Sequence, residues 1–115
     1  MKKDDRVYFL HIRDAIERVA EYTSGGKDAF FADRKTQDAV VRNLEVIGEA
    51  VKHVSTELKA TYPDIPWQRI AGMRDKMIHE YFGVNLKIVW EVVERDLREF
   101  DGKVLAILED LGERA

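Results

Sequence analysis

Residues 40–58 read VVRNLEVIGEAVKHVSTEL, and this stretch decides the fold. Its apolar residues recur at alternating spacings of four and three, the repeat of a helix that carries one continuous apolar seam. The seam consists of Val40, Leu44, Ile47, Val51, Val54 and Leu58. With Asp33 as its expected N-cap, the pattern predicts one long helix from residue 33 to about residue 60.

A second long helix is predicted before the seam. It is expected to begin with Asp4 or Asp5 as N-cap and to run to about Tyr22, where the run Thr23-Ser24-Gly25-Gly26 ends it. Its expected apolar stripe consists of Val7, Leu10, Ala15, Val19 and Tyr22. A short helical turn around residues 28–31 would follow and bury Phe30 or Phe31.

Two further helices are predicted after the seam. Pro66 ends a loop over residues 62–66 and suits the first position of a helix that packs Trp67 and Ile70 inward and ends at Gly83. Asn85 is expected to cap the last helix, and the pair Asp101-Gly102 predicts a kink or a break within it. The apolar stripe of this helix comprises Leu86, Val89 or Trp90, Val93, Leu97, Phe100, Val104, Leu108 and Leu111.

Together these patterns predict an all-α fold, an antiparallel bundle of four to five helices that forms a single domain over residues 1–115. No segment shows the sustained alternation of a β-strand. Two long seams offer more apolar surface than one small core needs, which favours a helix-mediated homodimer. The alternative is that both seams meet inside one bundle.

Composition limits the class of protein. The chain is 45% hydrophobic and 36% charged, as expected of a soluble folded domain, and its net charge of −3 confines any nucleic-acid binding to a local patch. It has no cysteine, so disulfides and zinc–thiolate sites are excluded and a reducing cytoplasm fits. The charged start and the lack of an apolar run of about 20 residues argue against a secretion signal and a membrane span.

Residues 72–83, GMRDKMIHEYFG, hold most of the candidate chemistry. Arg74 is a permanent cation with a planar donor fork that suits phosphate, and His79 normally titrates near neutral pH. His79 could act as general base on an RNA 2′-hydroxyl or as general acid, while Arg74 stabilises charge on the phosphate. Asp75, four residues before His79, could orient the imidazole, and Tyr81 offers a phenolic hydroxyl.

Helical geometry leaves the assembly of this site open. Arg74 and Tyr81 share one face, but Arg74 and His79 are about 140° apart on an ideal helix. The length of the arginine, a distortion near Gly72, or a two-fold dimer interface could bring them together. A net-acidic nuclease also needs a focused positive cleft. The candidate cations are Arg42, Arg69, Arg74, Lys76 and Lys87, unless they are dispersed surface charges.

Two other classes of function compete with a nuclease. One is a non-catalytic helical adaptor that binds a nucleotidyltransferase or a nucleotide. The other is a metal-dependent hydrolase built from His11, His53, His79 and carboxylates, but these histidines lack ligand spacing such as His-x3-His. We therefore expect neither a metal nor a cofactor.

The pattern Arg74-x4-His79-x-Tyr81 resembles the signature of HepT-like toxins of the HEPN superfamily. The similarity extends to residues 42–50, to residues 67–82 and to the following helix from Asn85 to Leu97. It implies a HEPN-type helical bundle, usually a homodimer with the catalytic cleft at its interface. It also implies a metal-independent ribonuclease that is the toxin of a type VII toxin–antitoxin pair.

The resemblance also implies roles for individual residues. Arg74 and His79 correspond to catalytic residues. Tyr81 corresponds to the site at which a minimal nucleotidyltransferase antitoxin (MntA-like) attaches AMP from ATP, and it could also contact the substrate. That modification would place a phosphate beside Arg74 and occupy the position meant for RNA. Supporting positions near the motif or in the matching segments are Asp75, Lys76, Arg42 and Asn43.

Overall fold

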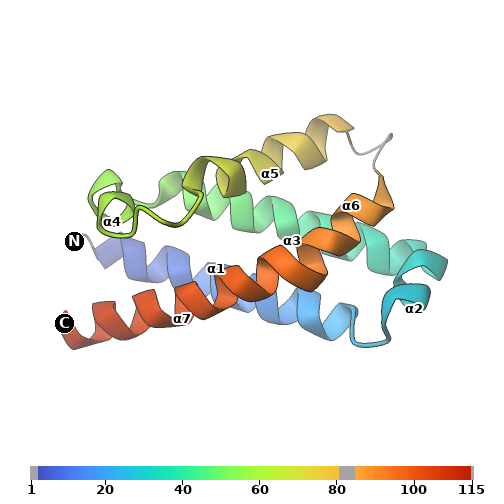
Figure 1. Ribbon diagram of the computed structural model, residues 1–115, viewed down its shortest axis with the longest axis horizontal. Coiled ribbons are helices and arrows are strands. Elements are labelled where there is room, and N and C mark those ends of the chain that lie inside the picture. The colour runs from blue at the N-terminus through green and yellow to red at the C-terminus, as the bar shows by residue number, and fades with distance from the viewer. Residues whose placement is uncertain (1–2, 81–84, 115) are drawn as a thin grey trace.

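The computed structural model describes the backbone of residues 3–80 and 85–114, and the side chains of residues 5–73 and 85–112. Figure 1 shows a bundle in which successive long helices run antiparallel. The long helices are α1 (Lys3–Tyr22), α3 (Arg34–His53), α5 (Trp67–Glu80) and a continuous arm made of α6 (Leu86–Glu91), the π-helix η2 (Val92–Asp96) and α7 (Leu97–Arg114). Two short helices, α2 (Lys27–Ala32) and α4 (Thr56–Thr61), join them. The expected all-α bundle is confirmed.

One core runs through the bundle. Helix α3 packs against α1 and against α5, and α7 packs against α1. All six residues of the α3–α4 seam are buried, as the sequence predicts. Within the described part of the chain, no helix is both long and apolar enough to cross a membrane.

Local signals fix several helix ends as expected. The Asp33 carboxylate accepts hydrogen bonds from the backbone N–H of Lys35 at 3.2 Å and from the Thr36 hydroxyl at 2.7 Å, so it caps α3. Asn85 caps α6 by accepting from the backbone N–H of Lys87 at 3.0 Å. Before α2, Gly26 has a φ of 93°, a conformation that favours glycine.

The predicted helix over residues 33–60 is wrong in one respect, because it is two helices. Helix α3 ends at His53, and α4 begins at Thr56 with Ser55 as its N-cap. The Ser55 hydroxyl accepts the backbone N–H of Leu58 at 3.2 Å and donates to the Asp5 carboxylate at 2.6 Å. The break therefore comes from a contact with a distant residue, and the apolar spacing continues across it.

The expected N-cap and apolar stripe of the first helix are also largely wrong. Helix α1 begins at Lys3, and Asp5 lies buried within it. The exposed fractions of Val7, Leu10 and Tyr22 are 49%, 44% and 40%. Ala15 and Val19 are buried as predicted, but they share the buried face with Phe9, Ile12 and Ile16. Both stripes have helical spacing. The face that is buried is the one that includes Phe9, whose ring packs edge-on against Trp67 at a centroid distance of 6.2 Å.

The last arm departs from the prediction as well. Helix α7 passes through Asp101-Gly102 without a break, and the Asp101 carboxylate accepts from Arg13 Nε of α1 at 2.7 Å. The irregularity lies earlier, at the π-helix over residues 92–96. Val89, Val93 and Leu97, which follow one another at spacings of four, are all buried along this arm.

Candidate functional site

Helix α5 carries the Arg-x4-His motif, and its first turn is firmly anchored. The Trp67 indole N–H donates to the carbonyls of Lys59 at 3.2 Å and Tyr62 at 3.0 Å. The same ring packs edge-on against Phe9 of α1 and Phe100 of α7. Ile70, one turn on, is buried. As expected, Trp67 and Ile70 face inward, and they fix where α5 starts on the bundle.

The motif residues follow this anchored turn. Arg74, Asp75, Lys76 and His79 lie on α5, within its bounds at Trp67 and Glu80, and their side chains lie outside the described residues. Tyr81 and the expected helix end at Gly83 also lie outside the described residues. The roles assigned to these five motif positions therefore stay predictions.

The two supporting positions on α3 have different surroundings. Arg42 is exposed and pairs with Glu45 at 3.3 Å. Asn43 is buried, with an exposed fraction of 7%. Its side-chain oxygen accepts from Arg18 Nε at 2.9 Å, and its amide donates to the carbonyl of Ala39 at 2.8 Å. Asn43 thus ties α3 to α1, a structural role that the sequence does not signal.

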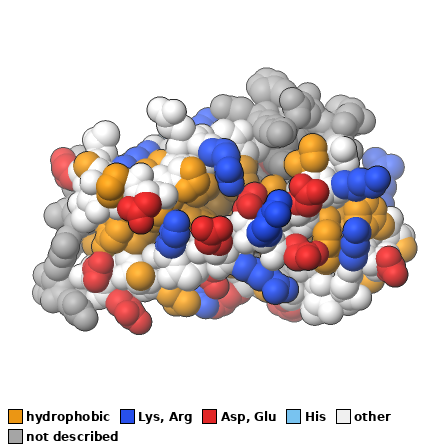
Figure 2. Space-filling model, viewed as in Figure 1, with side chains coloured by type: hydrophobic (Ala, Val, Ile, Leu, Met, Phe, Trp, Pro, Cys, Tyr) orange, Lys and Arg blue, Asp and Glu red, His pale blue; other side chains and the backbone are white. Residues whose placement is uncertain are grey.

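The described candidate cations lie apart from one another. Arg42 borders a groove between α1 and α3, whereas Arg69 of α5 borders a different cavity and pairs with Asp96 Oδ2 at 3.5 Å. Lys87 is exposed on α6. Figure 2 shows Lys and Arg interleaved with Asp and Glu on the face viewed. On the described part of one chain, Arg42 and Arg69 do not combine into a single positive cleft.

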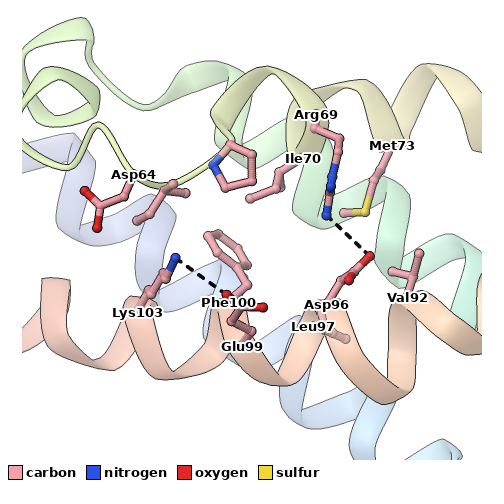
Figure 3. A pocket seen from close by; sticks show the side chains of 12 residues that line it. Asp64, Arg69, Ile70, Met73, Val92, Asp96, Leu97, Glu99, Phe100 and Lys103 are labelled. Atoms are coloured by element: carbon pink, nitrogen blue, oxygen red, sulfur yellow. Dashed lines mark ion pairs between the residues drawn. The ribbon is translucent and has the colours of Figure 1, made fainter.

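The cavity beside Arg69, here the α5–α7 cleft, lies between the motif helix and the last arm (Figure 3). Its volume is about 330 Å³. Asp64, Ile65, Pro66, Arg69, Ile70 and Met73 form one wall, and Val92, Asp96, Leu97, Glu99, Phe100 and Lys103 form the other. The sequence does not predict this cleft, because its two walls come from segments that are far apart along the chain.

The histidines outside the motif lie at the groove between α1 and α3. Its lining includes both His11 and His53. The His53 ring stacks on Tyr8 at a centroid distance of 5.5 Å, and its Nε2 lies 3.3 Å from a Glu49 carboxylate oxygen. Among the residues with described side chains, no group of three or more His, Asp or Glu could hold a metal ion.

Comparison with known proteins identifies the family to which this helical chain belongs. The family model described as "Ribonuclease HepT-like" matches residues 12–107. The chain therefore belongs to the HepT-like ribonuclease family.

Two relatives illustrate the similarity. "Probable ribonuclease HepT" of Thermococcus cleftensis is 43% identical over 104 residues, which are 90% of this chain and 94% of the relative. "Gamma-glutamylcyclotransferase and putative RNase" of Methanocaldococcus jannaschii is 44% identical over 112 residues, which are 96% of this chain. The chain spans half the length of the Methanocaldococcus protein. No solved structure matches the chain.

Proposed function

We propose that this chain is a metal-independent endoribonuclease and the toxin of a toxin–antitoxin pair. The observation that carries the proposal is the family match over residues 12–107, which contains the whole Arg74-x4-His79-x-Tyr81 pattern. Arg74 and His79 lie within α5, whose first turn is anchored by Trp67. A rigid helix that starts at a fixed place suits groups that must act together on one phosphate.

The proposed reaction is an internal transesterification of RNA. His79 removes the proton of a 2′-hydroxyl, the resulting oxygen attacks the adjacent phosphorus, and the bond to the 5′-oxygen breaks. The leaving oxygen takes up a proton from water and the protonated His79 returns its proton to water, which gives a 2′,3′-cyclic phosphate and a 5′-hydroxyl end. Arg74 binds the non-bridging oxygens and stabilises the charge that develops on them. Asp75 orients the imidazole, and DNA is spared because it lacks the nucleophile.

A homodimer completes the proposed site. Positions 74 and 79 are about 140° apart around an ideal helix, so they lie on different faces and do not meet at one point simply by being on the same helix. A two-fold axis near α5 would supply a second copy of each group and double the local positive charge. In this proposal Arg42 and Lys76 add to the RNA-binding surface, and Asn43 supports it by holding α1 against α3.

Control by a partner is the remaining element of the proposal. A minimal nucleotidyltransferase antitoxin transfers AMP from ATP to the Tyr81 hydroxyl and releases pyrophosphate. The added phosphate occupies the position of the RNA phosphate near Arg74 and repels the substrate. The pair would act in the cytoplasm, where both RNA and ATP are present.

The decisive experiment measures RNA cleavage by purified, unmodified protein in excess EDTA. We expect cleavage that leaves 2′,3′-cyclic phosphate ends, and a loss of about 100-fold or more in Arg74→Ala and His79→Ala. His53→Ala is the matched control, because His53 is an exposed histidine of α3, outside the motif. Cleavage retained by both motif variants would refute the mechanism. Absence of turnover in protein whose intact mass shows no modification would favour the adaptor.

A further inference from the structure

We propose that the α5–α7 cleft binds one nucleobase of the RNA, next to the phosphate that is cleaved. This inference rests on the proposed ribonuclease function. The cleft lies about one helical turn before the Arg-x4-His motif, and none of its lining residues takes part in the proposed reaction.

The size and the floor of the cleft suit a flat, largely apolar ring. Its volume of about 330 Å³ lies in the range of small-ligand sites. Ile70 of α5 and Leu97 and Phe100 of α7 are buried at its base. Met73 and Val92 are half-buried on opposite walls. A base that enters would exchange water for apolar contacts on both faces.

The charges at the rim favour a base over a phosphate. Three carboxylates, those of Asp64, Asp96 and Glu99, outnumber the two cations, Arg69 and Lys103. Each cation already has a carboxylate partner, Arg69 with Asp96 at 3.5 Å and Lys103 with Glu99 at 3.9 Å (Figure 3). The net negative rim would repel a phosphate, whereas it would not repel an uncharged base.

The same rim can hydrogen-bond a base. Carboxylate oxygens accept from exocyclic amino groups, and Arg and Lys donate to the acceptors of guanine. Both ion pairs are long and partly exposed, with side-chain exposed fractions of 70% and 42% for Arg69 and Asp96. Such pairs contribute little to stability, so they can open to contact a ligand at small cost.

The position of the cleft along α5 links it to the motif. Arg69, Ile70 and Met73 line its wall, and Arg74 is the next residue. Position 76 follows Met73 by three and Arg69 by seven, and residues at these spacings share a helix face. A base in the cleft would therefore leave its phosphate near the turn that bears Arg74 and Lys76.

Binding can be tested without any cleavage. Among the three methionines, only Met73 lines the cleft in the described part of the chain, so its ¹³C-labelled methyl group is a local NMR probe, assigned with Met73→Leu. The probes are AMP, GMP, CMP and UMP, with ribose 5-phosphate as the matched compound that lacks a base. We expect at least one nucleotide to shift the Met73 signal in a saturable way and ribose 5-phosphate not to shift it.

A variant that fills the cleft tests its occupancy. Val92→Trp adds a bulky ring at the cleft wall, whereas Ile88→Trp adds the same ring at an exposed position of α6 that does not line the cleft. We expect Val92→Trp to abolish the nucleotide-induced shift and to raise KM for RNA about tenfold, with little change in kcat. Ile88→Trp should leave both unchanged. Circular dichroism checks that each variant is folded.

An abasic substrate gives a test that does not depend on any substitution. Removing the base beside the cleaved bond should raise KM for the wild-type protein about tenfold and should have no further effect in Val92→Trp. A Met73 signal that no nucleotide shifts, in protein that cleaves RNA, would overturn the cleft proposal and leave the ribonuclease standing. A nucleotide shift without RNA turnover would show that the cleft binds a base, but it would overturn the ribonuclease and with it the placement of that base beside a cleaved phosphate. A shift produced only by a protein partner would identify the cleft as a protein-docking site and overturn the proposal.

Discussion

Asp5 of α1 and Ser55 between α3 and α4 are joined by two hydrogen bonds across 50 residues of sequence. One Asp5 carboxylate oxygen accepts the backbone N–H of Ser55 at 2.9 Å, and the other accepts its hydroxyl at 2.6 Å. The carboxylate is almost completely buried, with an exposed fraction of 1%. The contact fixes the end of α3 against the start of α1, and α3 is the helix on which the motif helix packs.

Removing this carboxylate should destabilise the protein. Asp5→Ala leaves the N–H and hydroxyl of the half-buried Ser55 without their acceptor, so we expect the free energy of unfolding to fall by about 1–3 kcal/mol. Asp14→Ala, an exposed position of the same helix, should change it by no more than about 0.5 kcal/mol. Urea denaturation at one fixed protein concentration measures both. Equal effects in the two variants would show that the contact contributes nothing specific.

The buried face of α1 can be tested by a pair of truncations. Ile12 is fully buried, whereas Leu10 has an exposed fraction of 44%. Ile12→Ala should cost about 2–5 kcal/mol, because it leaves a cavity in the core, and Leu10→Ala should cost about 0.5 kcal/mol. Thermal or urea unfolding decides between the two faces. A larger loss for Leu10→Ala would restore the stripe first expected from the sequence.

The N-cap of α3 makes a prediction about pH. The pKa of Asp33 is lowered from its ordinary value of 3.8, chiefly because the Thr36 hydroxyl donates to its carboxylate, with further lowering by the Lys35 backbone N–H. Because the pKa of Asp33 is lower in the folded state than in the unfolded state, the capping bonds stabilise the protein fully above pH 3.8. This stabilisation is lost as the pH falls through the folded-state pKa. Thr36→Val should therefore move the pKa of Asp33 upward in an NMR titration, and an unchanged pKa would contradict this cause.

Silencing by the antitoxin should depend on one tyrosine. With a purified cognate nucleotidyltransferase and ATP, the wild-type chain should gain the mass of AMP and lose RNA cleavage by about 100-fold or more. Tyr81→Phe lacks the acceptor oxygen, so it should gain no AMP and should therefore still cleave RNA. Tyr22→Phe, which alters an exposed tyrosine of α1, should behave like the wild type. Modification of Tyr81→Phe would place the acceptor elsewhere.

The sequence by itself determined the helical class, the antiparallel order and several helix ends. These follow from local chemistry: the seam from Val40 to Leu58 has helical spacing, and Asp33 and Asn85 satisfy the free N–H groups of the helices they precede. The family pattern Arg74-x4-His79-x-Tyr81 is equally local and is legible in the sequence alone. Each of these signals depends only on residues a few positions apart.

The tertiary structure alone decided what depends on distant partners. Two stripes of α1 had helical spacing, and packing against Trp67 selected the one that contains Phe9. The break at Ser55 follows from Asp5, and the continuity of α7 at Asp101 accompanies a bond from Arg13. The α5–α7 cleft forms where the loop before α5, α5 itself and the last arm come together, and two residues of the π-helix line it. Such features escape a reading of the sequence because apolar spacing fixes a helix but not which of its faces a distant segment will cover.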